Sequence, residues 1–136
     1  MNLIATPLKY EDYDNILVGW WDDWKWVAPQ RDFLPQDGMG GMIVWDGDKP
    51  VCAGFIYNTN SKVSWIDWVI SDKNYKKKPE RQDALELLLL TLGEVCKKEG
   101  NKYSYALLRH DKLIETYKKL GFRAGEQYSQ EMIKIY

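Results

Sequence analysis

The sequence has few of the residues that build metal and disulfide sites. Its 136 residues include two cysteines, Cys52 and Cys96, and one histidine, His110. Neither cysteine belongs to a CxxC pair or to a metal-ligand spacing, so we expect no disulfide framework and no metal site. A reducing compartment suits such a chain, and we expect a cytoplasmic protein.

Long apolar runs and an excess of charge are also missing. No apolar run exceeds four residues, as in the leucines at 87–90, whereas a membrane helix needs about 20. Glu11 and Asp12 make the amino terminus acidic too early for a secretory signal. The formal net charge is −1, so no overall field favours nucleic acid or an anionic membrane. We therefore expect neither a membrane nor a nucleic-acid partner.

Tryptophan is the unusual component. Four of the seven tryptophans lie within WWDDWKW at residues 20–26. The chain length fits one domain covering residues 1–136, which can bury a core without crosslinks.

Periodicity predicts alternating strands and helices. Helical spacing recurs from Tyr13 to Trp24, from Pro79 to Gly100, and from Asp111, a candidate cap, to Leu120. Asp46-Gly47 predicts a hairpin, and residues 28–41 form an irregular, Pro- and Gly-rich loop. The expected strands are 2–5, 42–45, 51–57, 63–71, 103–108 and 130–136. The order β-α-β-β-β-α-β-α-β predicts an α/β fold (α+β mixed sheet) with helices on both faces.

The strand at 63–71 has two largely apolar faces, so we expect it to be central and covered on both sides. Strict alternation assigns the odd-numbered residues, with Asp67, to one face. It assigns the even-numbered residues, with Ile66, Trp68 and Ile70, to the other face.

A basic segment precedes the second helix. Lys76, Lys77 and Lys78 stand before Pro79, and Arg81 follows. A helix amino terminus offers free N–H groups and a positive dipole end to an anion, and arginine can grip phosphate oxygens in pairs. No glycine lies between Tyr75 and Leu92. A solvated basic turn is therefore the alternative interpretation.

This order of elements, together with LIETYKKLGF at residues 113–122, resembles the GNAT superfamily of acyl-CoA N-acyltransferases over nearly the whole chain. The most specific part is the spacing of Tyr117, Gly121 and Phe122, and residues 50–55 are similar to the family's third strand. The Trp-rich first helix and the Leu-Pro-x-x-Gly loop at residues 34–38 resemble small members often carried by phages and prophages.

The resemblance implies a binding site for acetyl-CoA where the fourth strand splays from its neighbour, with the pyrophosphate on the helix start that follows. The family's loop is Gln/Arg-x-x-Gly-x-Gly/Ala, and residues 81–84 match it without a glycine. His110 stands where the family usually has Asn and is a candidate for the pantetheine arm, or else a helix start. The other implied cofactor residues are Trp68, Val69, Ile70, Ser71, Lys76, Lys77, Lys78, Arg81, Gln82 and Ala84.

The resemblance implies a catalytic role for Tyr117, and the place of Asp67 in the sequence makes it a second candidate. Tyr117 is placed to protonate the leaving thiolate, since a phenol has an ordinary pKa near 10; core packing is the alternative. Asp67 is an acidic residue within an apolar strand, which makes it a candidate general base. The alternative is a carboxylate bonded to neighbouring backbone. The oxyanion donor implied by the family is a backbone N–H near Val69 or Ile70.

In the family, the first helix and its loop border the acceptor site. Trp26, Asp22, Asp23 and Asp32 are therefore candidates for a pocket that binds a cationic amine by charge and cation–π contact. The other tryptophans of that helix are expected in the core.

Two functions are consistent with the sequence. The first is acetyl-CoA-dependent N-acetyl transfer to a primary amine, small or on a protein, by direct attack in a ternary complex, because neither cysteine has the setting of a nucleophile. The second is a catalytically weak or inactive GNAT-fold module that binds a host protein. Oligomeric state stays open, with a homodimer among the alternatives.

Overall fold

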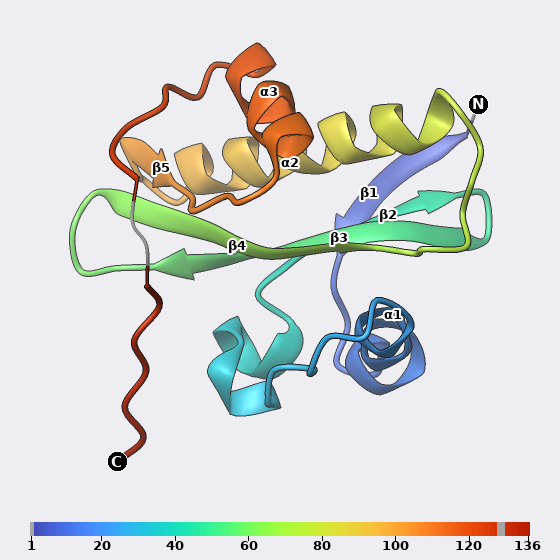
Figure 1. Cartoon of the computed structure of the whole chain (residues 1–136), viewed down its shortest axis with the longest axis horizontal. Helices are drawn as coiled ribbons and strands as arrows, with labels where there is room; N and C mark the ends of the chain where they lie inside the picture. The colour runs from blue at the N-terminus through green and yellow to red at the C-terminus, as the bar shows by residue number, and fades with distance from the viewer. Residues whose placement is uncertain (1, 128–129) are drawn as a thin grey trace.

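A five-stranded mixed sheet forms the centre of the protein (Figure 1). The computed structural model describes residues 2–127 and 130–136. The strands lie in the order β1-β2-β3-β4-β5, with β1 to β4 antiparallel and β5 parallel to β4. This confirms the predicted class and the position of β4 inside the sheet. The strands are β1 (Leu3–Pro7), β2 (Gly41–Asp46), β3 (Lys49–Asn58), β4 (Val63–Ser71) and β5 (Tyr103–Tyr105).

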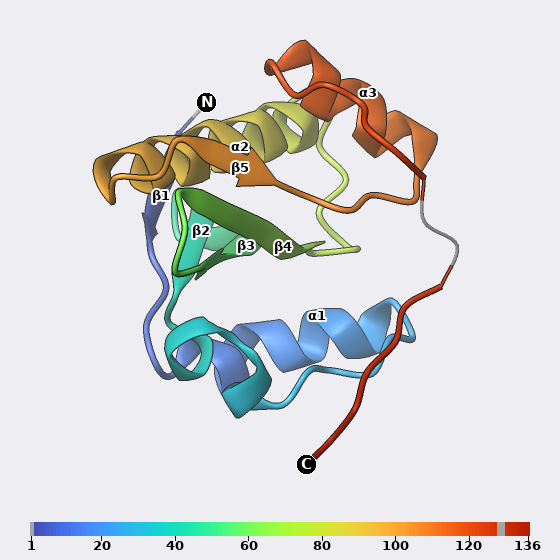
Figure 2. The ribbon, with the colours of Figure 1, turned by 90° about the vertical axis from the view of Figure 1, so that its left-hand side faces the viewer.

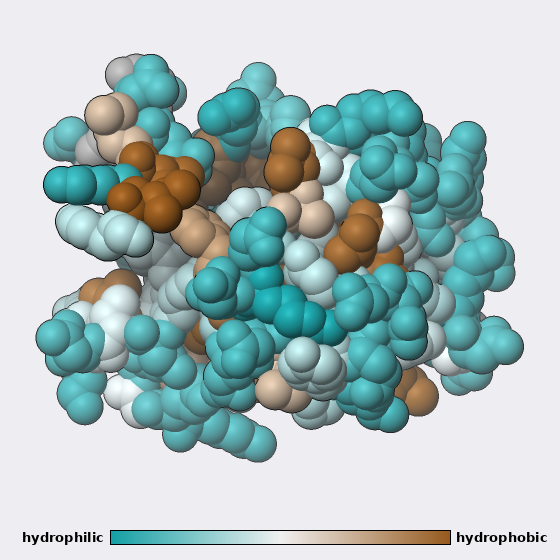
Figure 3. Space-filling view, turned by 90° about the horizontal axis from the view of Figure 1, so that it is seen from below, coloured by the Kyte–Doolittle hydropathy of each residue, from teal (hydrophilic) through white to brown (hydrophobic). Residues whose placement is uncertain are grey.

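Helices cover both faces of the sheet, as predicted. A π-helical turn (Tyr13–Leu17) leads into α1 (Val18–Asp23) on one face, whereas α2 (Glu80–Lys98) and α3 (Asp111–Lys119) lie on the other (Figures 1 and 2). Seen from the α1 side, the surface is mostly hydrophilic with separate hydrophobic patches (Figure 3). No helix among the described residues is long and apolar enough to cross a membrane.

Each helix layer buries its apolar stripe against the sheet. On α2, Leu88, Leu92 and Cys96 recur every four residues and therefore share one buried face. On the other side, Trp21 of α1 packs with Phe55 of β3. The described cysteines are free and buried. Burial raises the pKa of Cys52 to about 12, so this thiol is not an activated nucleophile.

The predicted faces of β4 are wrong because the strand contains a β-bulge. Trp68 has a left-handed backbone with φ of 54°. Phe55 pairs with Asp67 but Ala53 pairs with Ile70, so β4 holds one extra residue there. The extra residue reverses the alternation: Ile66 packs on the α2 side, whereas Trp68 and Ile70 pack on the α1 side.

Two predicted element ends and one predicted strand are also wrong. β5 stops at Tyr105 instead of Leu108, because the chain then leaves β4 and has no ladder to continue. Residues 130–136 form no strand, and their apolar side chains are exposed; no described segment pairs with them to satisfy their backbone groups. Asp111 is the first residue of α3 and His110 occupies the cap position, without a side-chain capping bond. His110 is thus the cap residue of the helix, in place of the predicted Asp111.

Candidate active site

A pocket opens where β4 and β5 separate. The two strands pair only as far as Trp65 and Tyr105, whereas β4 continues to Ser71. Among the described residues, no strand pairs beyond Trp65 with the backbone groups of β4 that point away from β3. The pocket has a volume of about 210 Å³. Six of the predicted site residues line it: Trp26, Asp67, Trp68, Val69, His110 and Tyr117.

Tyr117 reaches this pocket from α3. Gly121 has φ of 103° and ends the helix, and the N–H of Phe122 donates to the carbonyl of Tyr117 at 3.0 Å. The rings of Tyr117 and Phe122 then lie 4.9 Å apart. Tyr117 is 2% exposed, and burial, together with the charge of Asp67, raises the pKa of its phenol. The phenol therefore stays protonated at neutral pH, and no described residue accepts its proton.

Asp67 lies on the same pocket. Its Oδ1 accepts a hydrogen bond from the N–H of Trp68 at 2.8 Å, while no described residue donates to its other oxygen. Burial raises the pKa of Asp67, the Trp68 N–H opposes this, and the charge of Glu131 adds to it. The predicted bond to neighbouring backbone is therefore present, the carboxylate also lines the pocket, and its role as a general base stays a prediction. A carboxylate whose pKa moves upward becomes a stronger base.

Contacts on both faces of the sheet stabilise the bulge at Trp68. Its indole N–H donates to the hydroxyl of Tyr57 at 2.9 Å, and its ring meets Trp21 and Phe33 edge-on at 6.1 and 5.9 Å. Opposite the bulge, a Cβ on Gly54 would lie 3.0 Å from Leu92. Glycine at position 54 therefore lets β3 approach α2 closely opposite the bulge. The indole of Trp68 forms part of the pocket wall toward α1.

The predicted acceptor residues are not brought together. Trp26 is 48% exposed, stacks on Trp24 at 5.7 Å and lines the pocket. Asp22 and Asp23 are exposed at the end of α1, and Asp32 is exposed on a 3₁₀ turn; none of the three lines the pocket. No group of three or more His, Cys, Asp or Glu side chains in the described part of the chain could hold a metal ion.

The remaining pocket wall was missed by sequence reasoning. The segment between β5 and α3 contributes Leu107, Leu108 and Arg109. The first two were predicted to lie in a strand, and Arg109 was not predicted to have any role. Leu113 of α3, Ile66 of β4 and Trp21 of α1 complete the lining. Nothing in the sequence marks Leu107, Leu108 and Arg109, because their place depends on where β5 stops.

The start of α2 presents unpaired backbone donors, close to the position predicted from Pro79. Five N–H groups there have no acceptor among the described residues, namely those of Lys76, Lys77, Lys78, Glu80 and Gln82. Buried Tyr75 donates its hydroxyl to Asp46 Oδ2 at 2.8 Å and so ties the loop to the end of β2. Lys77 Nζ lies 3.5 Å from the same carboxylate oxygen. The side chains of Lys76 and Lys78 are exposed.

Several predicted cofactor residues are engaged inside the protein. The guanidinium of Arg81 donates to the carbonyls of Asp72 and Tyr75 at 2.7 and 2.6 Å and to Ser71 Oγ at 2.7 Å. Ala84 is fully buried in the α2 layer, and Ile70 is buried on the α1 side. These contacts give the side chains a structural role in the loop and core, and their contact with a cofactor stays a prediction.

Comparisons with known proteins reveal similarity in structure only. No family model and no curated protein matches the sequence. The crystal structure of glucosamine-6-phosphate N-acetyltransferase from Arabidopsis thaliana matches with a TM-score of 0.71 at 12% identity, over 98% of this chain and 100% of that one. An aminoglycoside acetyltransferase from an uncultured soil metagenomic sample, in complex with trehalose, matches at 0.68 and 14%, over 98% and 97%. A Trypanosoma brucei acetyltransferase matches at 0.64 and 17%, over 97% and 100%. These likenesses show a shared fold.

Proposed function

We propose, from the GNAT acetyltransferase fold that this chain shares, that the protein transfers an acetyl group from acetyl-CoA to a primary amine. The observation that carries the proposal is the pocket at the β4–β5 split. It places a carboxylate, Asp67, and a protonated phenol, Tyr117, on one cavity. Acyl transfer from a thioester to an amine needs one group that takes a proton and one that gives a proton.

The two side chains divide this work. Asp67 takes a proton from the ammonium group, and the neutral amine nitrogen then bonds to the thioester carbon. Backbone N–H groups on the unpaired edge of β4 stabilise the oxyanion. Tyr117 gives its phenolic proton to the sulfur as the carbon–sulfur bond breaks. The nitrogen of the new amide releases its second proton to solvent, Tyr117 takes one back from solvent, and Asp67 gives up the proton that it accepted. No covalent enzyme intermediate forms, because Cys52 is buried as a thiol.

The chain offers contacts for two parts of acetyl-CoA, the pyrophosphate and the pantetheine arm. The unpaired N–H groups at the start of α2 and the exposed Lys76 and Lys78 suit the pyrophosphate. The free edge of β4, Val69 and His110 border the space for the pantetheine arm. One observation favours the alternative of a non-catalytic binding module: Arg81, the side chain best suited to grip phosphate, is used inside the loop.

Thermal unfolding with acetyl-CoA separates the two functions. Acetyl-CoA at about 100 times its dissociation constant stabilises a protein by about 2.7 kcal/mol, so we expect the melting temperature to rise by several degrees. Release of free coenzyme A should then depend on an added amine, tested with polyamines, aminoglycosides, amino acids and peptides. No shift at millimolar acetyl-CoA would reject the enzyme, and a shift without amine-dependent release would support the binding module.

Arg81→Ala is expected to weaken acetyl-CoA by about 1.5–3 kcal/mol, the range for a hydrogen bond to a charged group. Affinity falls either because a direct contact with the phosphate is removed or because the loop loses the hydrogen bonds from the guanidinium. Isothermal titration measures it, with Lys78→Ala as the matched removal of an exposed charge, for which a smaller loss is expected. Equal affinity in Arg81→Ala and the wild type contradicts both roles.

A further inference from the structure

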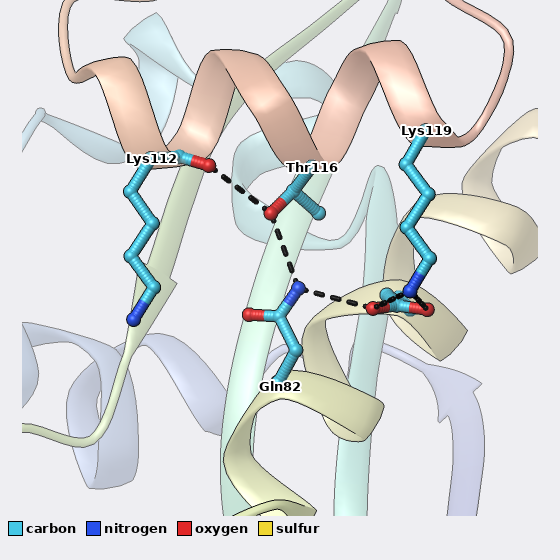
Figure 4. Close-up of polar contacts among 5 residues, drawn as sticks. Gln82, Lys112, Thr116 and Lys119 are labelled. Carbon is cyan, nitrogen blue, oxygen red and sulfur yellow. Dashed lines mark hydrogen bonds and ion pairs between the residues drawn. The ribbon is translucent and has the colours of Figure 1, made fainter.

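A polar network joins α2 to α3 beside the pocket (Figure 4). Gln82 Nε2 donates to Thr116 Oγ1 at 3.1 Å and to Glu86 Oε2 at 3.0 Å. Thr116 Oγ1 donates to the carbonyl of Lys112 at 3.2 Å, and Lys119 Nζ lies 3.0 Å from Glu86 Oε2. Side chains from two helices are thus linked through a single amide.

The donor directions in this network admit few side chains at position 82. Thr116 uses its one proton on the carbonyl of Lys112, so toward Gln82 it can only accept. Glu86 is held ionised: the hydrogen bond from Gln82 and then the one from Lys119 lower its pKa. It too can only accept. The side chain at position 82 must therefore supply two N–H donors, as the glutamine amide does.

The network connects the two working parts of the proposed site. Gln82 lies in the first turn of α2, and its backbone N–H is one of the five unpaired donors. Thr116 is 5% exposed and directly precedes Tyr117 in the chain. A displacement of Thr116 would therefore move the phenol.

We propose that Gln82 is a positioning residue that sets the place of the Tyr117 hydroxyl relative to the turn that receives the pyrophosphate. It acts through Thr116 and Glu86, and its side chain does not touch the reacting atoms. This inference rests on the proposed function.

Gln82→Met removes both donors while keeping the length and the neutral charge of the side chain. We expect kcat to fall about 10- to 100-fold, since a small misplacement of a catalytic group has effects of this order, with the KM for acetyl-CoA nearly unchanged. Thr116→Val should behave alike and Thr116→Ser should retain wild-type kcat. Glu115→Gln, which breaks an exposed ion pair with Lys118 on the same helix, is the matched control and should leave kcat unchanged.

A double-mutant cycle tests whether Gln82 acts through Tyr117. In a Tyr117→Phe background, Gln82→Met should cause no further loss of kcat, because the proton donor is already gone. A further loss as large as in the wild-type background overturns the inference, as does a change confined to KM.

Hydrogen exchange of the free protein separates this inference from the proposed function. Residues 111–119 should exchange faster in Gln82→Met than in the wild type and in Glu115→Gln, even if no amine is acetylated. Equal exchange in all three proteins overturns the role of Gln82. Absence of turnover together with the expected exchange pattern rejects only the acetyl transfer.

Discussion

Replacing Tyr117 with Phe is expected to lower kcat by about 10²- to 10⁴-fold, the usual contribution of a positioned general acid. The phenol is buried and its pKa is raised, so it is protonated at neutral pH and can donate its proton to the leaving thiolate. Phe keeps the ring contact with Phe122 and removes only the hydroxyl. Steady-state kinetics with acetyl-CoA and an accepted amine measures the loss.

The same variant should bind acetyl-CoA with wild-type affinity and unfold at a similar temperature. No described residue accepts a hydrogen bond from the hydroxyl of Tyr117, so no intramolecular bond is lost. An unchanged kcat would remove the acid role and leave Tyr117 as a core residue. A large fall in melting temperature would show instead that the substitution disturbs the packing between α3 and the sheet.

Asp67→Asn is expected to lower kcat/KM by about 10²- to 10⁴-fold and at the same time to stabilise the protein at neutral pH. The carboxylate is partly buried and its pKa is raised by burial, so ionisation of Asp67 costs folding free energy. Asparagine keeps an oxygen that can accept from the N–H of Trp68 but carries no charge to bury. Turnover and melting temperature should therefore change in opposite directions.

The pH dependence of this stability difference has a definite sign. In the folded state Asp67 binds its proton more tightly than in the unfolded state, where the pKa is about 3.9. The wild type therefore loses stability as pH rises from about 3.9 through the folded pKa. The Asn variant should match the wild type at the acid end of this window and exceed it at pH 7. Equal melting temperatures from pH 4 to 8 would contradict the buried charge.

The sequence determined those elements whose signals are local. The spacing of Leu88, Leu92 and Cys96 predicts the buried face of α2, since residues four apart share one side of a helix. Asp46-Gly47 predicts the hairpin between β2 and β3, where Gly47 has φ of 63°. The spacing of Tyr117, Gly121 and Phe122 predicts how α3 ends. Apolar side chains on both faces of β4 predict a strand covered by helices.

Only the tertiary structure decided how β4 and its surroundings form the pocket. Alternation along the sequence cannot reveal the left-handed backbone at Trp68, which depends on the close approach of Gly54 and on the aromatic contacts made by α1 and its loop. That bulge places Asp67 and Trp68 next to each other on the pocket wall.

The tertiary structure also decided which polar side chains remain available. Arg81 and Gln82 carry N–H donors that could bind phosphate. The side chain of Arg81 instead donates to Ser71, Asp72 and Tyr75. The side chain of Gln82 donates to Thr116 and Glu86. These partners are up to 34 residues away in the chain. The bond from Gln82 to Thr116 has no local pattern, because it exists only once the sheet has brought α2 and α3 together.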